Sequence, residues 1–462
     1  MSESNLQQGA AASEFQEKGS AKISNPSQLL DASCSKLEKL GGFDLIEMVV
    51  DGSQNLNPAK KARKKIFLSE ADKKAERTTL KKSLQLWMKM LTENQSVADM
   101  IDKSETKAKT TDALLKSNLL SALNTTKDLE RSYRSVALFY KNSESDKIKN
   151  ISVMNAGLDQ LKDLDNPKFI DAVSEELKQN YDRLDLRDNY SLMCIPGYLG
   201  SNKVVEKWGK IAHENKVMLV TDFEHLDAPD DVLELFESAN LTGGDIFRSN
   251  VMMTCNWLVG RGKVNEVGEE DNLFVPPSAA LAGKMYRTLM SQVTAGKKHG
   301  GMNEVDGVAF DLKKSEIASL EKTGLVPMVN EYGKVMAFSA KTLFNGDNLG
   351  LQTYSVVRVF DYITKVLIDF LNRRAFENFN SKSERELRTQ MTKFLDSITG
   401  PDNLIESFKI LRFIQDPNQK DRIYLDIHMT PYFPGKSFMI KMDGQKGDDP
   451  NSAEWATEYA KG

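Results

Sequence analysis

The residue types that most often carry chemistry are dispersed along this 462-residue chain. Its four histidines are His213, His225, His299 and His428. Its three cysteines are Cys34, Cys194 and Cys255. No histidine stands near a second histidine or a cysteine at the spacing of a zinc or iron site, and the cysteines are typical of reduced thiols in a cytosolic protein. We therefore expect no metal site and no disulfide.

Motifs for binding phosphate or forming a nucleophile are missing as well. GYLGSNK, residues 197–203, has the composition of a phosphate-binding loop but not its order, and LTGGD, residues 241–245, is better explained as a turn. No G-x-S-x-G elbow occurs, and acidic pairs such as Glu269-Glu270 fall in polar stretches that do not separate their pKa values. The sequence predicts a protein without catalytic residues or a cofactor. An α/β enzyme with an unrecognised site is the alternative from another class.

Composition narrows the class of protein further. Apolar content is 40% and charged content 28%, as in ordinary globular proteins. The net charge of −4 is not that of a nucleic-acid-binding domain, so we expect no nucleic-acid partner. Residues 1–20 lack the pattern of a signal peptide, and no window reaches the roughly 18 apolar residues of a membrane span. We expect a cytoplasmic protein that does not insert into membranes.

The N-terminal part is polar and then helical. Residues 1–25 are predicted to be a mobile tail, and residues 26–150 a charged helical region. This region opens with an amphipathic helix, residues 27–40, whose apolar side includes Leu29, Leu30 and Leu37. The basic run at residues 60–65 is either a solvated helix face or a docking surface for an acidic partner.

The remainder, residues 190–444, is predicted to be the core. Apolar runs at 216–223 and 250–259, with a helix at 228–238 between them, are typical of a βαβ-like parallel sheet. Pro277 suits the first turn of a helix, and residues 326–330 and 334–338 form a predicted hairpin.

The end of this core is predicted to combine a long helix with strands. The helix, residues 354–379, carries apolar residues at helical spacing. Three strands follow, at 408–414, 422–428 and 437–442, and residues 445–462 are expected to be a flexible tail. The predicted fold class is therefore α+β with an α/β-like middle, a charged helical N-terminal region and a C-terminal edge-strand arm.

Four stretches in a fixed order resemble contractile sheath proteins. They are FVPPSAALAGKMYRT (274–288), EKTGLVPMVNEYGKVMAFSAKTLF (321–344), LQTYSVVRVFDYITKVLIDFLNRRAFENFN (351–380) and RIYLDIHMTPYFPGKSFMIKMDG (422–444). The superfamily includes phage tail sheaths and the larger, TssC-type sheath subunits of type VI secretion systems. Within it, the chain is similar to the TssC type of Bacteroidetes, which implies a contractile-sheath-like core.

The resemblance implies a structural role in a polymer. The chain would co-assemble with a smaller TssB-type subunit into a contractile sheath on a baseplate, and contraction would propel an inner tube of Hcp-type rings. A Clp-type disassembly ATPase would recognise the N-terminal helix through Leu29, Leu30 and Leu37. The sheath of a phage-tail-like or extracellular injection particle is the alternative.

Five residues are candidates for the interface or for packing. Arg358, Asp361 and Tyr362 lie on the long helix, where Arg358 and Asp361 are three positions apart and could instead pair with each other. Ile440 and Met442 lie on the last strand, which is either exchanged between protomers or an ordinary edge.

Overall fold

The computed structural model describes residues 71–93, 96–143, 148, 150–187, 189–436, 438–444 and 455–461. The chain divides into two units, Met1–Ser117 and Asn118–Gly462. The predicted tail 1–25, the helix 27–40 and the basic run 60–65 lie outside the described residues.

The first unit is helical at all of its described residues except Ser96. It contains the 3-10 turn η2 (Ala71–Lys73), helix α4 (Lys74–Glu93) and the first half of α5 (Val97–Asn142). None of its described side chains is buried, and leucines such as Leu80, Leu114 and Leu115 are exposed. This agrees with the predicted charged helical region.

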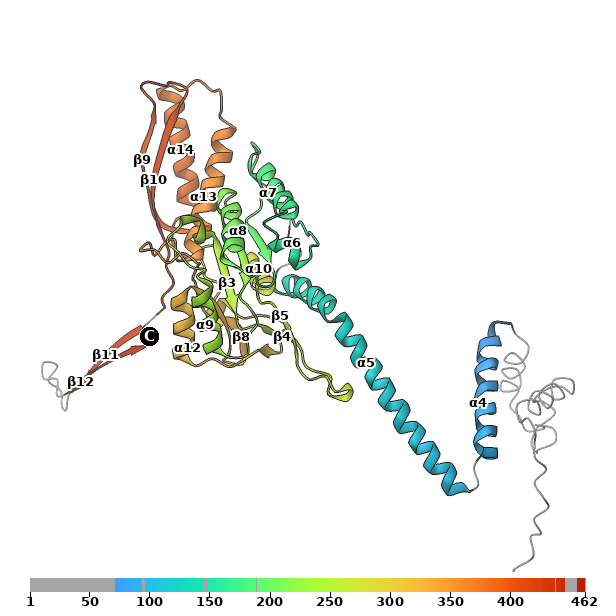
Figure 1. The fold of residues 1–462 in the computed structure, drawn as a ribbon. Helices are drawn as coiled ribbons and strands as arrows, with labels where there is room; N and C mark the ends of the chain where they lie inside the picture. The colour runs from blue at the N-terminus through green and yellow to red at the C-terminus, as the bar shows by residue number, and fades with distance from the viewer. Residues whose placement is uncertain are drawn as a thin grey trace, which may run out of the picture. The chain divides into compact units, whose positions relative to one another are not determined.

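A five-stranded sheet forms the centre of the second unit (Figure 1). Its strands, in spatial order, are β1 (Leu192–Ile195), β2 (Met218–Asp222), β3 (Val251–Cys255), β7 (Leu325–Glu331) and β8 (Lys334–Ala337). The first four are parallel, and β7 and β8 form an antiparallel hairpin. The predicted parallel sheet and the predicted hairpin are both confirmed.

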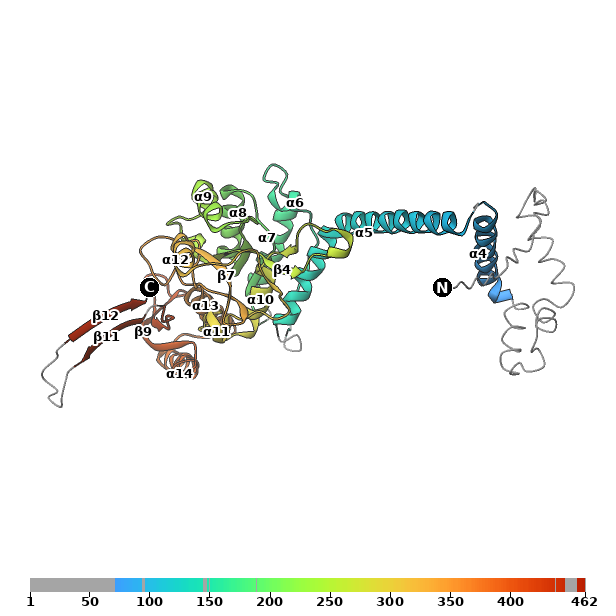
Figure 2. The ribbon, with the colours of Figure 1, turned by 90° about the horizontal axis from the view of Figure 1, so that it is seen from below.

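Helices cover both faces of this sheet, because successive strand residues point to opposite sides. One face packs against α8 (Asn202–Glu214), α9 (Pro229–Ala239) and α12 (Lys314–Thr323). The other packs against α10 (Ser278–Arg287) and the end of α5. On β2, Leu219 belongs to the first core, whereas Met218 and Val220 belong to the second. Figure 2 shows the same layers from below.

The predicted continuous strand at 250–259 is wrong. Strand β3 ends just before Asn256, which has a left-handed φ of 64°. The residues that follow form a separate strand, β4 (Leu258–Arg261). The Asn256 amide donates to the carbonyls of Phe310 and Met328, at 2.8 Å each, and so fixes the break. Strand β4 does not belong to the parallel sheet. It pairs with β5 (Leu273–Val275) and β6 (Gly307–Val308) in a separate three-stranded sheet.

The C-terminal part adds a third core. It comprises α13 (Tyr354–Asn372), α14 (Ser381–Ser397) and the antiparallel pair β9 (Ile405–Gln415) and β10 (Ile423–Pro431). Val359 and Ile363 of α13 pack against Met391 of α14 and Phe413 of β9. Helix α13 ends seven residues before the predicted position 379, and the sequence analysis did not predict α14.

The last two strands form a separate two-stranded sheet. They are β11 (Phe438–Gly444) and β12 (Trp455–Lys461), paired antiparallel. The predicted flexible tail is therefore wrong for Trp455–Lys461. The remaining helices of the second unit are α6 (Leu158–Lys162), α7 (Lys168–Tyr181) and α11 (Gly296–His299), with the 3-10 turns η4 (Ile246–Asn250) and η5 (Asn265–Val267).

Candidate functional site

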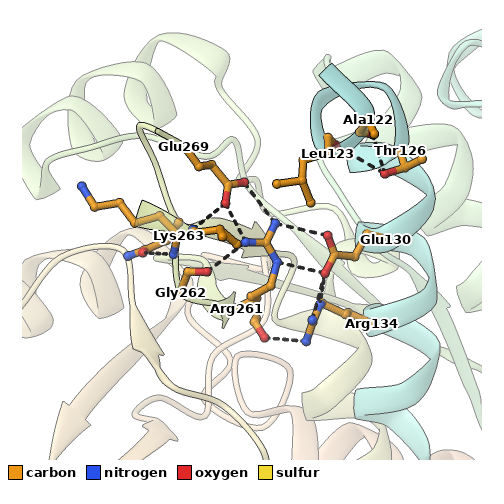
Figure 3. Close-up of polar contacts among 12 residues, drawn as sticks. Ala122, Leu123, Thr126, Glu130, Arg134, Arg261, Gly262, Lys263 and Glu269 are labelled. Carbon is orange, nitrogen blue, oxygen red and sulfur yellow. Dashed lines mark hydrogen bonds and ion pairs between the residues drawn. The ribbon is translucent and has the colours of Figure 1, made fainter. Parts of the chain in front are cut away.

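An ion-pair network holds the end of α5 against the core (Figure 3). Arg261, at the end of β4, donates from Nη1 to Glu269 Oε2 at 2.7 Å and from Nε to Glu130 Oε1 at 3.0 Å. Arg134, one turn beyond Glu130 on α5, donates to Glu130 at 2.9 Å and to the Gly260 carbonyl at 2.8 Å. Both arginines therefore bridge α5 to the β4 segment.

The electrostatics of this network favour its charged form. The Arg261 guanidinium lowers the pKa of Glu269 to about 2. Burial alone would raise the pKa of Glu130, but hydrogen bonds from Arg261 and Arg134 hold it below its usual value. Charge-assisted, two-point contacts of this kind are geometrically specific, so the network fixes the rotation of α5 on the core as well as its position.

The same helix makes a close backbone contact with α10. A Cβ atom at Gly283 would lie 2.3 Å from the Phe139 carbonyl oxygen, so only glycine fits there. Beyond this contact, Asn142 accepts from the Asn303 backbone N–H at 2.8 Å and closes the end of α5. The glycine at position 283 therefore allows α5 to approach α10 closely.

A buried carboxylate joins three elements at the carboxyl end of β2. Asp222 Oδ2 accepts from the Gly197 N–H at 2.8 Å and from Ser278 Oγ at 2.6 Å. Its Oδ1 accepts from the Ser278 N–H at 2.7 Å and from the Thr254 hydroxyl. This edge of a parallel sheet is where α/β enzymes commonly bind ligands, but here the protein's own donors occupy the carboxylate.

Neither Asp222 nor the residues of the ion-pair network were predicted from the sequence. Asp222 carries a usable signal, because it is a charged residue at the end of an otherwise apolar run. Arg261 carries none, because its partner Glu130 is 131 positions away and no local pattern connects them.

The three predicted α13 residues lie together on one cleft. Arg358, Asp361 and Tyr362 all line it. The alternative pairing of Arg358 with Asp361 is wrong in the described structure: Asp361 accepts from Asn250 Nδ2 at 2.8 Å and lies 3.8 Å from Lys216 Nζ. Burial raises the pKa of Asp361, although Lys216 opposes that shift.

The other predicted residues lie either on the two-stranded β11–β12 sheet or outside the residues that the structure describes. Ile440 of β11 is half exposed and stands opposite Tyr459 in the register. Met442 stands opposite Thr457. Leu29, Leu30 and Leu37 lie outside the described residues.

Three models of one protein family match successive parts of the chain. The TssC/VipB-like N-terminal region matches residues 30–119, the type VI secretion system TssC/VipB central domain matches 121–345, and the TssC/VipB-like C-terminal domain matches 353–461. The chain belongs to the TssC/VipB family of the type VI secretion system, and its identification from the sequence as a TssC-type protein is confirmed. The search among curated proteins gave no match.

Solved contractile sheath proteins are distant in comparison. The contracted helical sheath of the anti-feeding prophage is 16% identical, with a TM-score of 0.46, covering 68% of this chain and 81% of that one. The sheath tail protein of Desulfitobacterium hafniense is 11% identical, with a TM-score of 0.38, covering 58% and 60%. Among the described residues, no helix combines the length and apolarity needed to cross a bilayer.

Proposed function

We propose that this chain is the larger structural subunit of a type VI secretion sheath, built together with a smaller TssB-type partner. The observation that carries this proposal is the family match, which extends from residue 30 to residue 461 in three consecutive parts. The sheath surrounds a tube of Hcp-type rings, is anchored on a baseplate and propels the tube by contracting. The subunit works in the cytoplasm and catalyses no reaction.

The fold supports a protomer that stays rigid while the lattice changes. Its central sheet is covered on both faces, and the α13–α14 core extends it. Helix α5 is continuous over 46 residues, and the network of Glu130, Arg134 and Arg261 holds its end. A load applied along α5 is therefore transmitted to the β4 segment through charge-assisted hydrogen bonds and not through a loop.

The β11–β12 sheet supports connection between protomers by strand addition. A two-stranded sheet leaves one backbone edge of each strand without a partner inside that sheet, and such edges readily accept a further strand. Exchange of strands at this sheet would join protomers by main-chain hydrogen bonds that survive a change in lattice geometry.

Electron microscopy of the co-expressed pair tests the proposal. We expect hollow, cogwheel-shaped tubes when the chain is produced with its small partner, and none when it is produced alone. Monodisperse monomers under both conditions would contradict the assignment. Tubes formed by the chain alone would instead favour the sheath of an extracellular injection particle.

Deletion of residues 436–462 tests whether the β11–β12 sheet is needed for assembly. The deletion removes both strands of the β11–β12 sheet and none of the three buried cores. We expect a folded protomer, with an unchanged thermal transition, that forms no tubes. Normal tubes from this variant would exclude strand exchange at β11–β12 but would leave the sheath assignment intact.

The family resemblance also favours recognition by a Clp-type ATPase after contraction. The proposed recognition element is the apolar side of helix 27–40, with Leu29, Leu30 and Leu37. A labelled peptide spanning residues 1–42 should bind the cognate ATPase saturably. A matched peptide with the three leucines changed to serine should not bind, and equal binding of both peptides would contradict the proposal.

A further inference from the structure

A cleft of about 470 Å³ lies beside α13, between the segment that precedes β1 and the start of β2. Four cationic side chains lie on its wall, namely Arg187, Lys216, Arg358 and Lys365. Its apolar lining is Leu186, Met218, Met290, Tyr362 and Val366. The cleft therefore combines positive charge with an apolar surface, which suits a ligand that is acidic at one end and apolar along its stem.

Arg358 is the most unusual member of this wall. It is only 6% exposed, and its Nε and Nη1 atoms have no hydrogen-bond partner among the described residues. Its Nη2 has one weak contact, at 3.5 Å, with the Met285 carbonyl. Burial lowers the pKa of Arg358 to about 10, yet the side chain remains a cation at neutral pH. A buried guanidinium without an anionic partner is unfavourable, and proteins normally supply a carboxylate.

The carboxylates of the cleft are already engaged. Asp361 accepts from Asn250 and lies near Lys216, as described above. Asp369 accepts from the Leu186 N–H at 2.9 Å and from Arg373 at 2.6 Å. In the part of the chain that the structure describes, neither is hydrogen bonded to Arg358. Arg358 is therefore left without an anionic partner among the described residues, and an acidic group of another molecule can supply one.

A second unpartnered atom indicates what kind of molecule supplies it. Asn189 also lines the cleft, and its buried Oδ1 acceptor has no donor among the described residues. A free carboxylate offers only acceptors, whereas an acidic residue in a polypeptide brings its backbone N–H as well. The methylene stem of a glutamate would lie against the apolar wall.

We infer that this cleft is a carboxylate-binding site for a glutamate-type side chain of a neighbouring subunit, with Arg358 as its principal ligand. The choice of a neighbouring subunit rests on the proposed function, because a helical polymer repeats one heterologous contact along its length. The guanidinium offers two adjacent N–H donors in the fixed geometry that a carboxylate matches.

The substitution R358M separates folding from assembly. It removes an unpaired buried cation and keeps an apolar side chain of similar length, so the melting temperature of the free protomer should stay the same or rise. Polymerisation should require about thirtyfold more protein, as expected when one partner of a buried charge pair is removed. The matched control R388M changes an arginine outside the cleft that lies 3.7 Å from Glu384, and it should polymerise normally. Polymerisation of R358M at the wild-type concentration would overturn the inference.

Cross-linking identifies the occupant and remains informative if R358M fails to fold. In R358K polymers made from an equal mixture of isotope-labelled and unlabelled chains, a zero-length carbodiimide should link position 358 to an acidic residue of another subunit. Links from position 358 to Asp361 alone would overturn the inference.

Binding of glutarate to the free protomer tests the site apart from the polymer. Saturable binding by wild type, at least tenfold weaker in R358M, is expected for a carboxylate site. If wild type forms no polymer in the presence of its small partner, the proposed function fails. Glutarate binding still decides whether the site exists, and no binding would overturn it. Glutarate binding combined with polymers that are indifferent to R358M would overturn the assignment to a neighbouring subunit.

Discussion

Gly283 of α10 lies directly against the backbone carbonyl of Phe139 in α5, so closely that a Cβ atom at position 283 would be 2.3 Å from that oxygen. The contact explains why position 283 is a glycine. It also makes α5 part of the second unit's core at this point, because the neighbouring Leu138 is buried there.

The substitution Gly283→Ala should destabilise the protein by about 2 kcal/mol, because the clash is with backbone and α5 must shift. An alanine inside a helix would otherwise stabilise by roughly 1 kcal/mol, so the clash outweighs the gain in helix propensity. Urea unfolding measures the difference. Gly244→Ala is the matched control, since a Cβ there meets nothing within 4 Å, and an equal effect of both substitutions would refute the close contact.

Acid should weaken the Arg261 network in a defined range of pH. The pKa of Glu269 is about 2 in the folded protein, below the 4.5 of an unperturbed glutamate. Its contribution to stability is therefore complete above pH 4.5 and is lost as the pH falls toward 2. The variant Glu269→Gln should be about 1 kcal/mol less stable at neutral pH, and the gap should close in acid. Urea titrations at a series of pH values test this, and a gap independent of pH would contradict it.

The Asp222 junction should not tolerate an amide. Each carboxylate oxygen of Asp222 faces a backbone N–H, from Gly197 or from Ser278, so the NH₂ of Asp222→Asn meets a donor whichever way it turns. We expect a loss of about 2–4 kcal/mol in the free energy of unfolding. Thr254→Val removes only one of the four donors and should cost about 1 kcal/mol. Similar losses for the two variants would show that the carboxylate is not essential to the junction.

The exposed side chain of Ile440 should matter for assembly and not for folding. It is 49% exposed on β11, so Ile440→Lys should leave the thermal transition within 1 °C or so of wild type, as is usual for surface substitutions. If β11 joins protomers, tubes of the co-expressed pair should become rare in electron micrographs. Val153→Lys, at a site that is 69% exposed outside the hairpin, should assemble normally.

The sequence predicted those parts of the fold that local patterns encode. Buried parallel strands produce continuous apolar runs, and the one-sided apolar spacing of α13 produces a helical signal. Helix α14 was not predicted, because its buried side is narrow. Only Leu387, Met391 and Leu395 are buried, and they are set among charged residues. The end of strand β3 before Asn256 was also not predicted, because it depends on carbonyl groups contributed by residues 310 and 328.

The candidate site was likewise predicted only in part, because its tertiary contacts leave no local pattern in the sequence. The resemblance to contractile sheath proteins pointed to Arg358, Asp361 and Tyr362, and the structure places all three on one cleft. Their partners could not be predicted, because Asn250 and Lys216 are brought to α13 only by the folded sheet. Local spacing suggested that Arg358 and Asp361 pair with each other, whereas tertiary contacts engage Asp361 elsewhere.

If protomers exchange strands at the two-stranded β11–β12 sheet, each subunit can be joined to two neighbours. Each of its strands has one edge that the other does not cover, so one hairpin offers places for two added strands on opposite sides. If both places are filled by different neighbours, every subunit is joined to two others by main-chain hydrogen bonds. The connections between subunits then form a continuous network and not a set of independent pairs. If one of the two added strands is lost, the connection through the other remains.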